Sequence, residues 1–315
     1  MISKSYFVSI LFLTSLFSNS LAQAAIKVVT TIPDIAWMVQ EIGGSKVEAK
    51  ALLRGTENPH FVDAKPDFIL SASNADVVCF AGLELEVGYL PPVLSKSGNA
   101  KVQPAGIGYC DVSRNVSVRE KLQGPVDRSM GDVHPAGNPH YFLSPKALAE
   151  GAVEVTRVMS AVDPKNAAEY GKGLKAFQAK MDTLHTEIYA RLEPFRKAQN
   201  GKPILIEYHK EYAYFLEEYG ILSFGSIEDK PGVPPSAGRL AEIGGQAKSA
   251  GVKVALGADY NPQKTLQRFH EISSIPLAIV PTMIQEKGEI KKYEDLQRHI
   301  ADQLLKSLGS GPSIK

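Results

Sequence analysis

The chain has 315 residues, of which 44% are hydrophobic and 22% are charged, and its formal net charge is +1. A chain of this length buries a substantial core and normally divides into two domains. The nearly balanced charge gives no indication of a basic surface that binds nucleic acid or an anionic membrane, so neither is expected as a partner.

The first 24 residues have the pattern of a secretory signal peptide. Lys4 precedes a largely apolar run at residues 6–17, and the Ala-Gln-Ala of residues 22–24 offers the small side chains of a cleavage site. The mature protein is therefore expected to begin at Ala25. No cysteine lies at the cleavage site, so no lipid anchor is expected, and no later stretch is apolar enough to span a membrane. The sequence predicts a soluble protein of the Gram-negative periplasm.

Residues 25–162 alternate between predicted strands and helices. Short runs rich in β-branched residues predict strands at residues 26–31, 47–53, 77–81 and 101–104. Helices are predicted from Pro33, Pro66 and Glu86, and a further one from Ser144-Pro145 to Met159. This alternation predicts a parallel sheet covered by helices on both faces. Residues 110–137 are polar and contain glycines and prolines, so they are expected to form an irregular surface excursion.

Cys79 and Cys110 are the two cysteines of the chain. An oxidising compartment permits a disulfide between them. Cys79, however, lies in the apolar run of residues 77–80, which favours a buried free thiol. The pair is therefore interpreted as free, with the disulfide as the alternative. Two cysteines alone do not indicate a zinc site of the finger type.

Residues 163–199 are predicted to form one long helix. Asp163 can cap it, and Pro164 suits its first position. Apolar side chains then recur every three or four residues, at Ala167, Tyr170, Leu174, Phe177, Met181, Leu184, Ile188, Leu192 and Phe195. This spacing predicts one buried face, which outweighs the destabilising Gly171 and Gly173, while Pro194 kinks or ends the last turns. At 1.5 Å per residue the helix would span about 50 Å, long enough to join two lobes as a rigid rod.

Residues 200–315 return to the alternating pattern. Strands are predicted at residues 204–208, 221–224, 252–256 and 277–280, with helices starting near Tyr212, Ser236 and Pro262 and a final amphipathic helix at residues 293–308. The predicted fold class is therefore α/β. It has two lobes, residues 25–162 and 200–315, each a parallel sheet flanked by helices, and the long helix joins them.

Three histidines follow strands or turns where a ligand can bind. Asn-Pro-His occurs at residues 58–60 and again at 138–140, and Tyr208-His209 ends a predicted strand. In open α/β sheets ligands bind at the carboxyl ends of strands, so His60, His140 and His209 can face one crevice. Neutral imidazole suits zinc and other late first-row metals, and three imidazoles leave one position of a tetrahedron open. Taken alone, each Asn-Pro-His predicts only a turn with a surface histidine.

Longer motifs surround these histidines. They are Asn58-Pro59-His60-Phe61 followed by Lys65-Pro66-Asp67, then Asn138-Pro139-His140-Tyr141-Phe142-Leu143-Ser144-Pro145-Lys146, then Tyr208-His209-Lys210-Glu211-Tyr212-Ala213-Tyr214-Phe215. In this order they resemble the zinc/manganese solute-binding proteins of ABC importers, over essentially the whole mature chain. The resemblance implies that His60, His140 and His209 are metal ligands and that a membrane permease is the partner. A histidine rather than a carboxylate at position 209 is similar to the zinc-binding members, because manganese prefers more oxygen ligands.

The residues leave the fourth ligand open. The family usually supplies an Asp after a late strand of the second lobe, whereas this chain has Ile-Val-Pro-Thr-Met at residues 279–283. Water, Asp259 and Glu57 are the alternatives for the fourth position. Many zinc-binding members carry a long His-rich and acidic loop before the second motif, but here only Asp132 and His134 lie near it. We expect His134 to be solvated, with weak metal contact as the lesser alternative.

These expectations converge on a monomeric periplasmic protein, not an enzyme, that binds Zn²⁺ with high affinity and delivers it to an ABC importer permease. Manganese or iron as the transported metal is the alternative within the same class. A zinc-dependent hydrolase is an alternative from another class, because three histidines with an open fourth position also describe catalytic sites. It is disfavoured because the chain has no His-Glu-x-x-His motif and no general base in a recognisable place.

Overall fold

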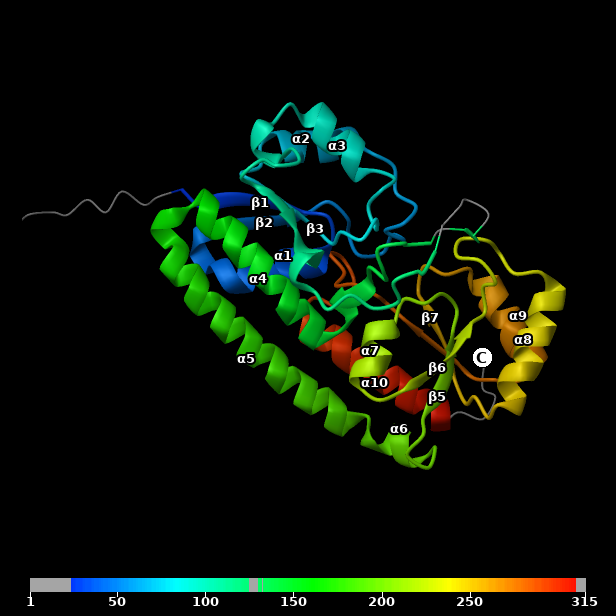
Figure 1. Cartoon of the computed structure of the whole chain (residues 1–315). Coiled ribbons are helices and arrows are strands. Elements are labelled where there is room, and N and C mark those ends of the chain that lie inside the picture. Colours follow the sequence, from blue (N-terminus) through cyan, green and yellow to red (C-terminus); the bar gives the residue numbers. More distant parts are fainter. Residues whose placement is uncertain (1–23, 125–129, 132, 310–315) are drawn as a thin grey trace, which may run out of the picture.

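The structure is a computed structural model that describes residues 24–124, 130–131 and 133–309. The predicted signal peptide, apart from Ala24, lies outside the described residues, and so does Asp132. Within those ranges, no helix is both long and apolar enough to cross a membrane. Figure 1 shows two α/β lobes and a long helix, α5, that runs along the outside of the molecule. The predicted two-lobed α/β fold with a long connecting helix is confirmed.

The N-terminal sheet contains four parallel strands in the order β2-β1-β3-β4. The strands are β1 (Ile26–Thr30), β2 (Val47–Ala51), β3 (Val77–Phe80) and β4 (Tyr109–Asp111). Helices α1 (Pro33–Gly43) and α4 (Pro145–Val162) lie on one side of it, and α2 (Pro66–Ser73) and α3 (Leu90–Ser97) on the other (Figure 1). Three of these helices begin with proline, as predicted, because a proline there loses only an N–H that has no partner.

The predicted strand at residues 101–104 is wrong. The chain forms a 3-10 helix there, Ala100–Val102, and the side chain of Asn99 caps it by accepting a hydrogen bond from the Lys101 N–H. The fourth strand is β4 instead, inside the segment expected to be irregular. β4 lies beside β3 with Cys79 opposite Cys110. Both thiols are buried and free, which confirms the buried-thiol interpretation over the disulfide.

The third helix begins later than predicted. Glu86 was expected to start it, but α3 begins at Leu90, because Pro91 and Pro92 fit only the first turn of a helix. Glu86 is buried before the helix. Its carboxylate accepts hydrogen bonds from Thr31 Oγ1 at 2.6 Å and from the Ala81 N–H at 2.7 Å, so it ties together two segments that follow β1 and β3.

The C-terminal sheet repeats the topology of the first, with parallel strands in the order β6-β5-β7-β8. The strands are β5 (Ile204–Glu207), β6 (Leu222–Ser226), β7 (Ala255–Ala258) and β8 (Leu277–Val280). Helices α8 (Ala237–Ser249) and α9 (Gln263–Ser273) cover one face, and α7 (Ala213–Glu218) and α10 (Tyr293–Gly309) lie on the other (Figure 1). β7 begins later than predicted because the Val252 N–H instead closes the end of α8, on the Ala247 carbonyl at 3.0 Å.

The long helix is shorter than predicted. A 3-10 turn, Pro164–Asn166, precedes α5 (Ala167–Arg191), and a separate short helix, α6 (Glu193–Lys197), follows. The break falls at Leu192, because Pro194 cannot donate the next helical hydrogen bond and its ring clashes with the preceding turn. The 25 residues of α5 span about 37 Å. Its buried stripe packs on α4 and α1 and then reaches α10.

One hydrophobic cluster contains buried side chains of both lobes, and a second cluster lies within the C-terminal lobe. Helix α10 closes this shared region. The Tyr293 hydroxyl donates to the Phe142 carbonyl at 2.8 Å, and Gln297 Nε2 donates to the Leu143 carbonyl at 3.0 Å. The Ile284 N–H also donates to Asp34 Oδ2 at 3.2 Å. The lobes are therefore joined by buried contacts as well as by the long helix.

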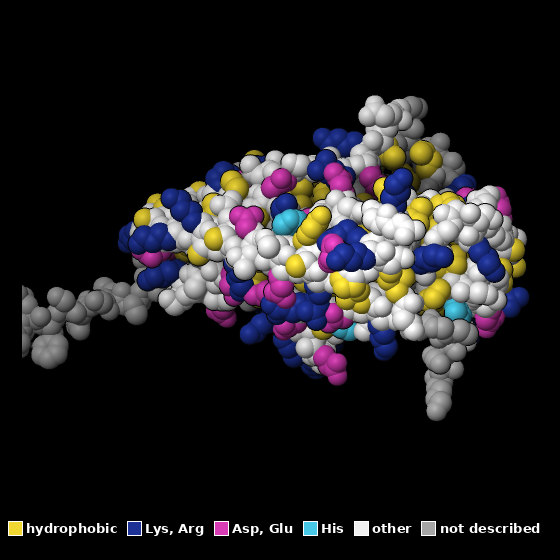
Figure 2. Space-filling model, turned by 90° about the horizontal axis from the view of Figure 1, so that it is seen from below, with side chains coloured by type: hydrophobic (Ala, Val, Ile, Leu, Met, Phe, Trp, Pro, Cys, Tyr) yellow, Lys and Arg dark blue, Asp and Glu magenta, His cyan; other side chains and the backbone are white. Residues whose placement is uncertain are grey.

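Charged side chains of both signs are interspersed on the face seen from below in Figure 2. Ion pairs also connect α5 with α10: Lys180 pairs with Glu294 at 2.6 Å, and Arg298 pairs with Glu187 at 2.6 Å. These ion pairs are exposed or half-exposed, so each contributes at most about 1 kcal/mol. They bind the last helix to the long helix along its solvent side.

Candidate metal centre

The Asn-Pro-His motifs are turns that the asparagine side chain closes. Asn58 Oδ1 accepts a hydrogen bond from the His60 N–H at 3.0 Å, and Asn138 Oδ1 accepts one from the His140 N–H at 2.9 Å. An asparagine that bonds the backbone two residues later forms an Asx turn. The two motifs therefore project their histidines from similar tight turns, the first after β2 and the second before α4.

Asn138 also sets the tautomer of His140. Its Nδ2 donates to Glu120 Oε2 at 2.9 Å and to the Lys210 carbonyl at 2.7 Å, which leaves Oδ1 as the acceptor. His140 Nδ1 lies 2.9 Å from that oxygen, so we assign the ring proton to Nδ1. The Nε2 lone pair is then available for a metal. Burial, together with the nearby His60 and His209, holds the pKa of His140 well below its usual value, which keeps the ring neutral.

His209 lies at the carboxyl end of β5, as predicted, and its partner is Glu228. His209 Nδ1 lies 3.0 Å from Glu228 Oε2, so this ring also presents Nε2 to the crevice. Burial acts to lower the pKa of His209. The hydrogen bond that His209 donates to Glu228 and the charges of Glu211 and Glu228 outweigh this effect, and the pKa is raised. A carboxylate behind a ligating histidine orients the ring and raises its basicity.

The structure brings His60, His140 and His209 together. Each offers a ring nitrogen, and these atoms all lie within 4.8 Å of one another. His60 Nε2 and His140 Nε2 are 2.9 Å apart. The ring centres are separated by 5.0 Å for His60 and His140, 5.5 Å for His60 and His209, and 5.6 Å for His140 and His209. Imidazoles bound tetrahedrally at 2.0–2.1 Å have ring centres about 5.2 Å apart, so the trio has the spacing of a metal site.

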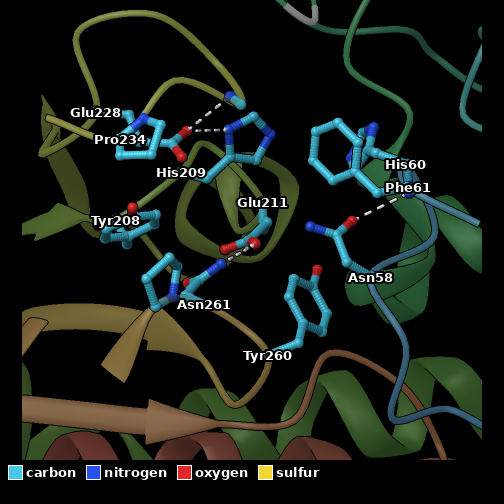
Figure 3. A pocket seen from close by; sticks show the side chains of 12 residues that line it. Asn58, His60, Phe61, Tyr208, His209, Glu211, Glu228, Pro234, Tyr260 and Asn261 are labelled. Atoms are coloured by element: carbon cyan, nitrogen blue, oxygen red, sulfur yellow. Dashed lines mark hydrogen bonds and ion pairs between the residues drawn. The ribbon is translucent and has the colours of Figure 1, made fainter. Parts of the chain in front are cut away.

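His60 and His209 border a cleft of about 260 Å³ between the lobes, shown in Figure 3. Asn58, His60 and Phe61 line it from the first lobe, and the second lobe supplies the remaining residues, Tyr208, His209, Glu211, Glu228, Gly232, Pro234, Tyr260, Asn261 and Pro262. Phe61 is 64% exposed at its edge. A small ion in this cleft would touch both lobes at once.

Glu211 lies in the floor of the cleft, where sequence reasoning assigned it no role. It is buried, and its Oε1 accepts a hydrogen bond from Asn261 Nδ2 at 3.1 Å (Figure 3). Burial raises the pKa of Glu211 to about 7, against the lowering effect of His209. Glu228 was also missed. Its only signal in the sequence is its position just after β6, at the strand end where ligands of such sheets bind.

The predicted alternatives for a fourth ligand point elsewhere. Glu57 Oε2 accepts hydrogen bonds from the Arg54 N–H at 2.9 Å and the Thr56 N–H at 3.3 Å, so its carboxylate closes its own loop. Asp259 Oδ2 accepts one from Gln285 Nε2 at 3.0 Å. Among the described residues, neither belongs to the group of three histidines.

His134 lies closer to the histidines than expected. Its ring centre is 5.0 Å from that of His60 and 6.5 Å from that of His140. It is half-buried rather than fully solvated. The sequence signal that could have found it is its place six residues before His140, on the excursion that leads into the second motif.

Comparison with known proteins identifies the same architecture. The model of the ZnuA family, described as "Zinc-uptake complex component A periplasmic", matches residues 28–307. The chain is 25% identical over 286 residues to the manganese ABC transporter substrate-binding lipoprotein PsaA of Streptococcus mitis, covering 90% of this chain and 89% of that one. It is 28% identical over 272 residues to the iron ABC transporter substrate-binding lipoprotein MtsA of Streptococcus pyogenes serotype M1, covering 84% and 82%.

A solved structure supports the fold. The crystal structure of a zinc-bound deletion mutant of ZnuA superimposes with a TM-score of 0.72 at 21% identity, covering 91% of this chain and all of that one. At this identity the likeness concerns the fold. The relatives named above are components of transporters, which leaves the hydrolase alternative without support.

Proposed function

Because this chain belongs to the ZnuA family, and is therefore a metal-binding substrate-binding protein of an ABC transporter rather than an enzyme, we propose that its cargo is Zn²⁺. The protein binds zinc with high affinity in the periplasm and delivers it to the membrane permease. His60, His140 and His209 are the ligands. The observation that carries this proposal is the grouping of their ring nitrogens within 4.8 Å of one another.

The donor set favours zinc. Three imidazole nitrogens suit late first-row metals, whereas manganese prefers carboxylate, carbonyl and water oxygens. Asn138 and Glu228 hold two of the rings with Nε2 toward the crevice, which matches the way ligating histidines are usually supported. The three histidines thus bind the ion, Asn138 and Glu228 orient two of the ligating rings, and the cleft between the lobes limits the contact of the ion with water.

Manganese or iron is the second candidate. The names of the relatives assign manganese to PsaA and iron to MtsA. Two carboxylates, Glu211 and Glu228, line the same cleft as His60 and His209. An oxygen ligand from either carboxylate would shift the preference toward these metals.

Native mass spectrometry of the purified protein tests the proposal. The metal-stripped protein is offered equal zinc and manganese, beside His60→Ala, His140→Ala and His209→Ala. His299→Ala is the matched control, because His299 is a half-buried residue of α10 that neither joins the three-histidine group nor lines the cleft. We expect one zinc per chain in the wild type and the control, and weakened binding in the three variants. A preference for manganese would favour the second candidate, and no bound metal at all would refute the proposal.

Export and delivery have their own tests. We propose that residues 1–24 are removed on export, which N-terminal sequencing of the exported protein measures, and that the mature protein acts as a monomer, which size-exclusion chromatography measures. The mature chain divides into lobes at residues 25–162 and 200–315, with a connecting segment at 163–199 that contains α5 between them. Zinc uptake by vesicles that contain the cognate permease should require the zinc-loaded protein.

A further inference from the structure

His134 belongs to the excursion between the N-terminal sheet and the second Asn-Pro-His motif. The backbone from His134 onward is held in place. The Leu122 N–H donates to the Pro135 carbonyl at 3.3 Å, and the Asn138 N–H donates to the Arg119 carbonyl at 2.9 Å. The Gly137 N–H donates to the His134 carbonyl at 3.0 Å, so a tight turn joins His134 to the motif that presents His140.

The excursion is also fixed to the second lobe. Lys210 Nζ pairs with Glu120 Oε1 at 2.8 Å, and the Tyr214 hydroxyl accepts a hydrogen bond from the Arg119 N–H at 3.0 Å. Lys210 directly follows His209 in the sequence. These contacts hold the excursion over the His209 side of the crevice, so its position depends on both lobes.

His134 faces the same space as the other histidines. A small cavity of about 120 Å³ is lined by His134, His140 and His209 together. The ring of His134 is also in contact distance of His60, with centres 5.0 Å apart. His134 thus lies near all three histidines: it lines one cavity together with His140 and His209, and its ring is close to that of His60.

The geometry points to His134 as the fourth ligand: we propose that it completes an all-nitrogen site with His60, His140 and His209. This inference rests on the proposed function and deepens it. The separation of 5.0 Å from His60 already matches the spacing of about 5.2 Å expected for tetrahedral imidazoles. The separation of 6.5 Å from His140 exceeds it, so binding of the metal draws the His134 ring inward by about 1 Å.

The neighbouring carboxylates are less suited to this position. Glu228 is engaged with His209 Nδ1, on the side of that ring away from the metal. The Glu211 carboxylate is directed toward Asn261 rather than toward His60 (Figure 3). A fourth nitrogen also removes the oxygen ligand that manganese prefers, so His134 determines selectivity for zinc and similar late metals.

Zinc K-edge X-ray absorption and competition with a zinc chelator test the role of His134. In the zinc-loaded wild type and the His299→Ala control, the spectrum should report four imidazole ligands. In His134→Ala it should report three, and zinc should bind about tenfold more weakly or worse. His134→Asp should raise the ratio of manganese to zinc bound at equal concentrations, because it replaces the nitrogen with oxygen. Circular dichroism establishes that each variant is folded, and His134→Asn serves as a second neutral substitution.

The outcomes separate this inference from the proposed function. Three imidazoles in the wild type, with unchanged affinity in His134→Ala and His134→Asn, would overturn the role of His134. The proposed function would still stand if His60→Ala, His140→Ala and His209→Ala weakened zinc binding. If none of these substitutions changed zinc binding, both the fourth ligand and the three-histidine site would fail together.

Discussion

Replacing Gly173 by alanine should destabilise the protein, whereas the same change at Gly171 should stabilise it. Both positions lie in α5, and helix propensity alone predicts that alanine raises the free energy of unfolding by about 1 kcal/mol at either one. At Gly171 an added Cβ would meet no heavy atom within 4 Å, so the full gain is expected. At Gly173 the Cβ would lie 2.1 Å from the Ile42 carbonyl oxygen, near the end of α1.

The size of the effect follows from that distance. Non-bonded heavy atoms are in favourable contact near about 3.5 Å, so α1 must retreat by more than about 1 Å to admit the methyl group. Overpacking of this kind typically costs about 1–3 kcal/mol, and the upper part of the range is expected because the obstacle is backbone. After the gain in propensity, Gly173→Ala should lose about 1–2 kcal/mol, and the two variants should differ by about 2–3 kcal/mol.

Equilibrium unfolding in urea, followed by far-UV circular dichroism, measures this difference. A chelator should be present throughout, because a metal that binds only the folded state would add its own stabilisation. The dependence of the unfolding free energy on urea should stay the same in both variants. If Gly173→Ala proved at least as stable as the wild type, the close approach of α1 to α5 and the reasoning from it would be refuted.

Three further predictions concern single side chains. Glu228→Gln should weaken zinc binding by about 10- to 100-fold, because His209 loses its carboxylate partner. Competition with a zinc chelator measures the affinity. An equal loss of affinity in the exposed control Glu286→Gln would contradict this prediction. The Cys79 and Cys110 thiols should react with Ellman's reagent only after unfolding, because both are buried and burial raises the pKa of Cys110; fast reaction of the native protein would argue against this packing. Burial raises the pKa of Asp34 from 3.8 to about 8, so the stability linked to its proton is complete below about pH 4 and is lost as the pH rises toward 8. In Asp34→Asn, the urea midpoint should therefore decrease less between pH 5 and pH 8 than in the wild type. An equal decrease in both proteins would contradict the raised pKa of Asp34.

The sequence predicted elements well where the decisive signal was local. Prolines at the first helical position marked the starts of α1, α2 and α4. Ser236 was expected to cap α8, and its hydroxyl accepts a hydrogen bond from the Arg239 N–H. Such signals depend on backbone groups that lie within one turn, so they can be recognised from the sequence without knowledge of the fold.

Elements were missed where partners distant in sequence decide the structure. β4 has only three residues, and it forms because its backbone pairs with β3, where Cys110 lies opposite Cys79. No local pattern of that length separates a strand from a loop.

The candidate site divides in the same way. The family resemblance carried by the motifs around His60, His140 and His209 implied which histidines meet, whereas each motif alone predicted only a local turn or strand end. Glu228 and His134 lie on loops outside those motifs, and their approach to the histidines depends on how the loops cross the crevice. Sequence spacing carries no information on that crossing.

The return of α10 to the first lobe sets an order for the assembly of the two lobes. Ile284, whose N–H binds Asp34, follows it by 250 residues, and Tyr293 in α10 stacks on Trp37 at 5.3 Å between ring centres. The first lobe therefore cannot complete its interior until the last helix is available to pack against it. Contacts of such long sequence separation form slowly, so the unfinished chain should stay accessible to chaperones and proteases until its final residues are in place.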